Sequence, residues 1–99
     1  MKLSKSIRTL LAATGLLLIQ GTASASDLYE GVIAYNSGEY EKAFALWEPL
    51  AKQGDHRAQY NMAMLYSNGK GVPQSDIEAT RWYKEAAAQG NEYAALHLK

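Results

Sequence analysis

The fold is decided by the stretch Ala58-Gln59-Tyr60-Asn61-Met62-Ala63-Met64-Leu65-Tyr66-Ser67-Asn68-Gly69-Lys70-Gly71-Val72-Pro73 and its continuation, Ala79-Thr80-Arg81-Trp82-Tyr83-Lys84-Glu85-Ala86-Ala87-Ala88-Gln89-Gly90. Both segments carry apolar residues at helical spacing. The Gly-Lys-Gly-Val-Pro segment between them contains two glycines, which adopt unusual dihedrals, and a proline, which cannot continue a helix. Alanines let helices approach closely, and large Tyr, Met and Trp side chains fill the space between them. The stretch therefore predicts two helices joined by a loop.

The rest of the chain predicts further helices of the same kind. Turn signals separate the helical patterns: Asn36-Ser37-Gly38-Glu39, then Gln53-Gly54-Asp55, then Gln89-Gly90-Asn91. Ser75 followed by Glu78 matches a capping box at the start of a helix. Pro49 lies inside a helical pattern, where it removes one backbone donor. The expected helices cover about residues 27–37, 40–51, 55–67, 75–89 and 92–98.

The chain repeats itself with a shift of 36 residues. This shift places Ala43 on Ala79, Trp47 on Tyr83, Ala51 on Ala87, Gln53-Gly54 on Gln89-Gly90, and Ala58 on Ala94. A period of this length, built from pairs of helices, is typical of an α-solenoid. Trp47, Trp82, Tyr66 and Tyr83 are accordingly expected in the core rather than in a ligand-stacking site.

The segment from Asp55 to Gly90 resembles a complete Sel1-like repeat, a relative of the tetratricopeptide repeat. The resemblance is carried by Met62-Ala63, Tyr66, Gly69-Lys70-Gly71-Val72-Pro73, Ala79, Trp82-Tyr83, Ala86-Ala87 and Gly90. Residues 30–43 are more similar to a tetratricopeptide unit with a short turn. The resemblance implies an all-α, right-handed solenoid of about two antiparallel helix hairpins plus a short C-terminal helix. It also implies that the first helix of each pair lines a concave, partner-binding side.

The end of the sequence departs from the repeat pattern. Residues 94–98 begin a further repeat that stops before its Gly-x-Gly-Val loop. About three repeats are usually needed for a stable solenoid. We expect the short last helix to cap the preceding one, with Tyr93, Leu96 and Leu98 as covering side chains. The alternatives are cover supplied by a partner, an end-to-end homodimer, or a truncated fragment of a longer array.

The first 25 residues have the pattern of a cleaved signal peptide. They combine a basic start (Lys2, Lys5, Arg8), a short apolar run at 10–19 and the small residues Ala23-Ser24-Ala25. The run is about half the roughly 20 apolar residues that a membrane-spanning helix needs. We therefore expect a signal peptide over 1–25, a repeat domain over 26–99, no membrane insertion after cleavage, and export to the periplasm, with the extracellular space as the alternative.

Charge and cysteine content exclude several classes of function. Removal of the signal segment leaves 7 basic and 10 acidic residues, a net charge of −3. Nucleic acids and anionic membranes attract basic surfaces, so neither is the expected partner. The absence of cysteine excludes disulfides, thiol chemistry and a cysteine-linked lipid anchor.

No catalytic or metal-binding constellation stands out. Ser67-Asn68-Gly69-Lys70 matches the Ser-x-x-Lys motif of penicillin-recognising enzymes, but that motif needs its serine to open a helix. His56 and His97 have no cysteine or paired carboxylate at ligand spacing, and we expect both to be solvated surface residues. The sequence therefore predicts no enzyme, no metal and no cofactor.

The expected partner-binding residues are Arg57, Tyr60, Asn61 and Met64, which lie off the packing face of the 55–67 helix. An exposed Tyr and Met beside Arg and Asn suits peptide recognition, with flexible apolar contact and amide hydrogen bonds. The alternative is that Tyr60 and Met64 pack against the neighbouring first-repeat helix. The predicted function is an exported protein-interaction adaptor that binds a protein or peptide, with a cell-wall or β-lactam ligand binder or enzyme as the alternative.

Overall fold

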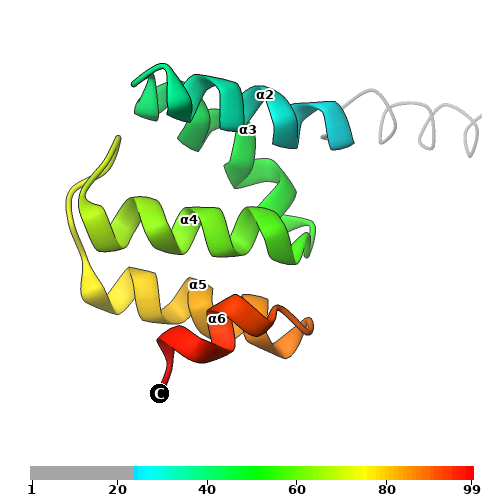
Figure 1. The fold of residues 1–99 in the computed structure, drawn as a ribbon, viewed down its shortest axis with the longest axis vertical. Helices are drawn as coiled ribbons and strands as arrows, with labels where there is room; N and C mark the ends of the chain where they lie inside the picture. The colour runs from blue at the N-terminus through cyan, green and yellow to red at the C-terminus, as the bar shows by residue number, and fades with distance from the viewer. Residues whose placement is uncertain (1–23) are drawn as a thin grey trace, which may run out of the picture.

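The computed structural model describes residues 24–99, which form five α-helices and no strand (Figure 1). The predicted all-α fold is confirmed, and every predicted helix boundary lies within two residues of the observed one. The expected signal segment lies almost entirely outside the described residues and stays a prediction. The helices are α2 (Ala25–Asn36), α3 (Tyr40–Lys52), α4 (His56–Asn68), α5 (Asp76–Ala88) and α6 (Glu92–His97).

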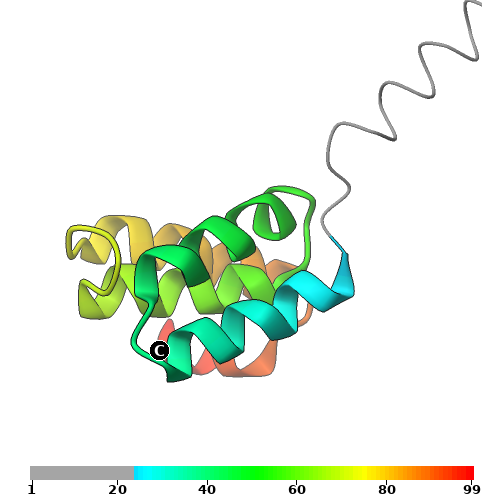
Figure 2. The same cartoon turned by 90° about the horizontal axis from the view of Figure 1, so that it is seen from above.

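The helices stack as an α-solenoid. Each helix packs chiefly on its neighbours in the chain, α2 on α3, α3 on α4, α4 on α5 and α5 on α6. Seen from above, α3 and α5 lie toward one side of the molecule and α2 and α6 toward the other (Figure 2). The molecule therefore consists of two hairpins, α2–α3 and α4–α5, followed by the short α6.

The same joint connects the hairpins and the last helix. Gly54 (φ +96°) precedes Asp55, and Gly90 (φ +95°) precedes Asn91. The Asp55 carboxylate accepts hydrogen bonds from the backbone N–H groups of Arg57 and Ala58, at 2.9 and 3.3 Å. The Asn91 side-chain oxygen accepts one from the Ala94 N–H at 2.9 Å. Both polar residues thus cap helices whose first N–H groups have no partner within the helix.

The other helix signals have mixed outcomes. The Ser75 hydroxyl accepts the Glu78 N–H at 3.1 Å and caps α5 as predicted. The Glu78 carboxylate pairs with Arg81 instead of returning to the Ser75 backbone. Pro49 is accommodated inside α3, which continues to Lys52.

The core lies between the helices and contains the predicted aromatic rings. Trp47, Trp82 and Tyr83 are buried, and the half-buried Tyr66 packs edge-on against Phe44 with ring centroids 6.1 Å apart. Around them lie small and aliphatic side chains: Leu28, Ala34, Ala43, Leu50, Ala51, Ala58, Met62, Ala63, Leu65, Ala79, Ala86 and Ala94.

The buried face of α2 is formed by Leu28, Gly31 and Ala34. Val32 is exposed and Tyr35 is half-buried, although both share helical spacing with Leu28. A Cβ at Gly31 would lie 2.1 Å from Trp47 Nε1, so the indole occupies the space of a missing side chain.

The short last helix packs on α5 as expected, but not through the side chains that were expected to cover it. Tyr93, Leu96 and Leu98 remain 69, 61 and 39 % exposed. Ala94 is buried there, and the His97 ring stacks on Tyr83 at 4.4 Å with an interplanar angle of 6°. An end-to-end homodimer at this face stays a prediction.

Candidate functional site

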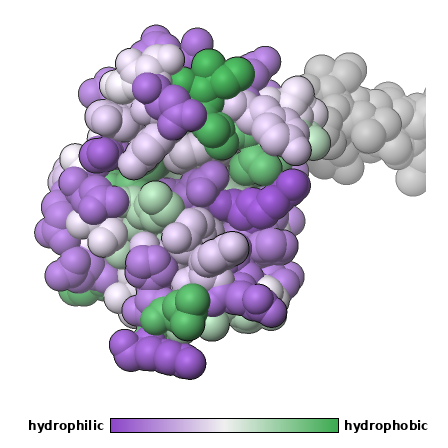
Figure 3. Space-filling model, in the orientation of Figure 1, coloured by the Kyte–Doolittle hydropathy of each residue, from purple (hydrophilic) through white to green (hydrophobic). Residues whose placement is uncertain are grey.

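The face shared by α2, α4 and α6 carries the predicted binding residues. Figure 3 shows apolar patches over α2 and α6 on this side, with paler and polar surface between them. The exposed apolar side chains of α2, α6 and the residue that follows α6 are Tyr29, Val32, Ile33, Tyr93, Leu96 and Leu98. Arg57, Tyr60, Asn61 and Met64 belong to α4, which runs between them.

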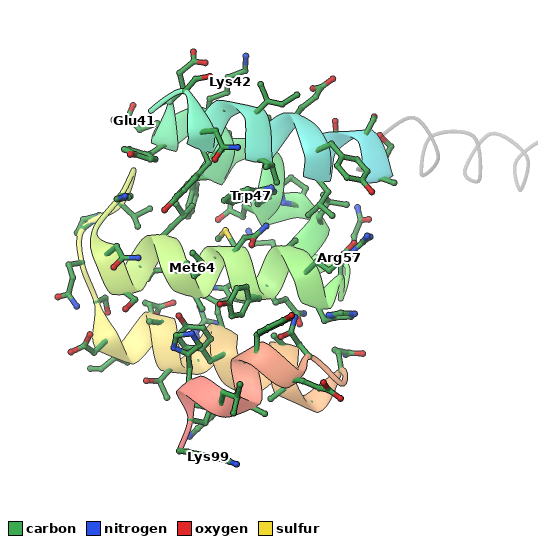
Figure 4. The ribbon with its side chains drawn as sticks, viewed as in Figure 1. Glu41, Lys42, Trp47, Arg57, Met64 and Lys99 are labelled. Carbon is green, nitrogen blue, oxygen red and sulfur yellow. The ribbon has the colours of Figure 1, made fainter. Side chains whose placement is uncertain are left out.

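A small apolar cavity lies between the first hairpin and α4. It has a volume of about 150 Å³ and is lined by Val32, Tyr35, Trp47, Asn61 and Met64. Trp47 and Met64 come from opposite sides of the space between α3 and α4 (Figure 4). The indole N–H of Trp47 donates to the Leu28 carbonyl at 3.1 Å, so this wall has a defined orientation. The structure thus brings Asn61 and Met64 together in one site.

A shallower hollow continues toward α6. Its walls come from the start of α4 and from the turn before α6, and its volume is about 450 Å³. Asn61 lines both this hollow and the apolar cavity. Its amide makes no hydrogen bond to the residues at 24–99, so its donors and acceptor are available to a ligand. The hollow is lined by His56, Arg57, Tyr60, Asn61, Gly90, Asn91, Glu92 and Tyr93.

Tyr60 packs within the protein, but not against the first-repeat helix as the alternative prediction held. Its ring lies 5.8 Å from Tyr83, 6.2 Å from Tyr93 and 5.8 Å from His97, centroid to centroid. Its hydroxyl is 3.4 Å from His97 Nε2. Burial and the nearby Tyr60 hydroxyl raise the pKa of Tyr83. Tyr60 therefore holds α6 on α4, and only its half-exposed side contributes to the surface.

Arg57 lies at the rim with its charge already paired. Its guanidinium is 3.1 Å from the Asp55 carboxylate, and this pairing raises the pKa of Arg57. Burial acts to raise the pKa of Asp55, but the hydrogen bonds from Arg57 and from two backbone N–H groups lower it overall. Arg57 therefore lies at the edge of the site with its positive charge already paired to Asp55.

Lys70 lies near the site, although the sequence suggested it only as part of a Ser-x-x-Lys match and of the repeat loop, not as a binding residue. Its ammonium lies 5.3 Å from the Tyr35 ring centroid and 4.9 Å from that of Tyr40, and these two groups raise the pKa of Lys70. No carboxylate of residues 24–99 pairs with it in the structure. The loop reaches this far because Gly71 (φ +76°) passes close to the Tyr40 carbonyl, where a Cβ would approach to 2.7 Å. The Gly-Lys-Gly spacing was the only sequence signal for this contact.

The residues considered for catalysis or metal binding do not form a catalytic or metal site among the described residues. Ser67 lies in the last turn of α4, and Lys70 faces two tyrosine rings. His56 is half-buried rather than simply solvated, since its Nδ1 is 3.1 Å from the Asn91 amide nitrogen. His97 is exposed as predicted, although one face of its ring stacks on Tyr83. Residues 24–99 hold no cluster of three metal-ligating side chains. Within the same range, no helix combines the length and apolar character needed to cross a bilayer.

Two segments of the chain match a known repeat family. The pattern of the Sel1 repeat matches residues 31–55 and again residues 56–91. The chain belongs to the Sel1 repeat family. The first match covers part of the segment that the sequence analysis compared with a tetratricopeptide unit, so both hairpins of this Sel1 protein belong to one repeat type. Sel1 repeats are typically non-enzymatic and generally mediate interactions between proteins.

The proteins that this Sel1 chain resembles are longer, and the chain spans less than half of the length of each. It is 37 % identical over 67 residues to an exopolysaccharide production negative regulator of Rhizobium leguminosarum bv. viciae, covering 67 % of the chain and 25 % of that protein. It is 32 % identical over 59 residues to the rat DAP3-binding cell death enhancer 1, covering 60 % of the chain and 12 % of that protein. The crystal structure of a Sel1 repeat protein from Oxalobacter formigenes matches 97 % of the chain and 42 % of that structure, with a TM-score of 0.70 and 27 % identity.

Proposed function

We propose that this protein is an exported adaptor that binds a segment of a partner protein along the face of α2, α4 and α6. The observation that carries the proposal is the apolar cavity at Met64, which lies beside the unpaired amide of Asn61. An apolar recess with a few placed polar groups is the usual composition of a binding site. One similar protein is named for binding DAP3, which supports a protein as partner.

Binding is tested by capture from envelope extract with the full chain, tagged at its C-terminus. The Asn61→Ala/Met64→Ala double variant removes the amide and one cavity wall. Ile77→Ala is the matched control, because Ile77 is 82 % exposed on α5, away from the site. We expect a specific protein on the wild type and the control, and its loss from the double variant at unchanged helicity. If the wild type retains no specific protein, the adaptor proposal is wrong.

Export is supported by the basic and apolar pattern of residues 1–25. The expected product in the periplasmic fraction begins at Ser26, and intact-mass measurement identifies it. Full-length protein found only in the cytoplasmic fraction would contradict export without affecting the binding proposal.

A further inference from the structure

We infer that the partner segment is an extended peptide that places one aliphatic side chain in the cavity between α2, α3 and α4 and a carboxylate beside Lys70. This inference rests on the proposed function and specifies its ligand. The site combines Val32, Trp47 and Met64 as apolar walls with Lys70 as the nearby cation.

The size and lining of the cavity select the anchor side chain. An apolar cavity of 150 Å³ is large enough for benzene, so a Leu, Ile or Met side chain fits the similar volume here. The amide of Asn61 lies on the wall of the same cavity and can bond both the N–H and the C=O of an extended backbone.

The charges around the cavity determine which side chain of the peptide lies next to the aliphatic anchor. Tyr35 is shared, since it lines the cavity and also carries Lys70 over its ring. Among the described residues, Lys70 has no acidic partner, whereas Arg57 on the other side is paired with Asp55. An added negative charge is therefore favoured on the Lys70 side.

The number of residues between the aliphatic and the acidic side chain of the peptide follows from the geometry of an extended chain. Side chains at i and i+2 of a strand point to the same side and lie about 6.6 Å apart. Lys70 Nζ lies 5.3 Å from the centroid of the Tyr35 ring, which forms the cavity wall. The recognised pattern is therefore an aliphatic residue and an acidic residue separated by one position. The direction in which the peptide runs is determined by whether a peptide with Leu before Glu or one with Glu before Leu binds.

The test uses the capped peptides acetyl-Gly-Leu-Gly-Glu-Gly-amide and acetyl-Gly-Glu-Gly-Leu-Gly-amide with the ¹⁵N-labelled full chain. We expect one of them to shift the Trp47 indole N–H and the Asn61 side-chain amide signals. Replacing its Leu by Ala should weaken binding about tenfold. Replacing its Glu by Gln should weaken it about two- to fivefold, and added salt should reduce that difference.

Protein variants complete the test. Val32→Phe fills the cavity mouth and should abolish the shifts, whereas Ile33→Phe, on the neighbouring and more exposed position, should preserve them. Lys70→Gln should remove the preference for Glu over Gln, and the exposed Lys84→Gln should not. Absence of shifts with both peptides, or equal binding by Val32→Phe, overturns the inference. A partner captured equally by wild type and Val32→Phe overturns it too, while leaving the adaptor function in place.

Discussion

Gly31 shows how one missing side chain shapes the candidate site. Gly→Ala inside a helix normally stabilises it by about 1 kcal/mol. Here the added Cβ would lie 2.1 Å from Trp47 Nε1, so the indole must move and lose its hydrogen bond to Leu28. We expect Gly31→Ala to lower the free energy of unfolding by about 2 kcal/mol, as overpacking does. Urea unfolding followed by circular dichroism measures this, and a neutral or stabilising result would contradict the packing.

Asp55 gives a pH dependence at the same scale. Its pKa is lowered in the folded protein, where the effect of burial is outweighed by the hydrogen bonds from Arg57 and two backbone N–H groups. Its contribution to stability is therefore fully present above the unfolded value of about 3.9 and is lost as pH falls through the lower, folded value. Asp55→Ala should cost about 1 kcal/mol at pH 7 through loss of the helix cap. The difference from wild type should shrink at pH 2.5. An equal difference at both pH values in urea titrations would refute the assignment.

At the scale of the helix, α6 is held by rings rather than by its exposed aliphatic residues. His97→Ala removes the stack on Tyr83 and the contact with Tyr60, and should cost about 1 kcal/mol. Leu96→Ala should change stability by less than about 0.5 kcal/mol, because Leu96 is 61 % exposed. Hydrogen exchange of the α6 amides should accelerate only in the first variant. Faster exchange in Leu96→Ala would mean that Leu96 helps to cover the preceding helix, as the sequence predicted.

The helices were predictable because their end signals are local. Asp55, Ser75 and Asn91 each precede the helix they cap, and their partners lie within three residues. The rotation of each helix about its axis was less predictable. Spacing alone does not show which side chains of α2 are buried, because Trp47 of α3 packs directly onto Gly31. Asn61 and Met64 were readable as residues off the packing face, but the cavity and the position of Lys70 depend on contacts between segments far apart in the chain.

At the scale of the whole molecule, the described residues form two helix pairs and the first helix of a third. By the shift of 36 residues, Leu98 and Lys99 correspond to Met62 and Ala63, so a copy of residues 64–90 placed after Lys99 completes the pair. In a solenoid each added unit contributes a new interface with its neighbour. We expect the extended chain to unfold at a higher urea concentration and with a larger m-value. A scrambled extension is the control, and an unchanged midpoint would mean that α6 already closes the stack.

The joint at Gly54-Asp55 and Gly90-Asn91 also has a consequence for inheritance. The two joints have nearly the same backbone angles, with glycine φ of +96° and +95° and a capping residue ψ of 111° in both. An in-frame duplication of codons 55–90 therefore joins Gly90 to Asp55 and recreates the same kind of joint at its seam. Such a duplication lengthens the protein by one whole helix pair, and the copied pair keeps its own helix cap.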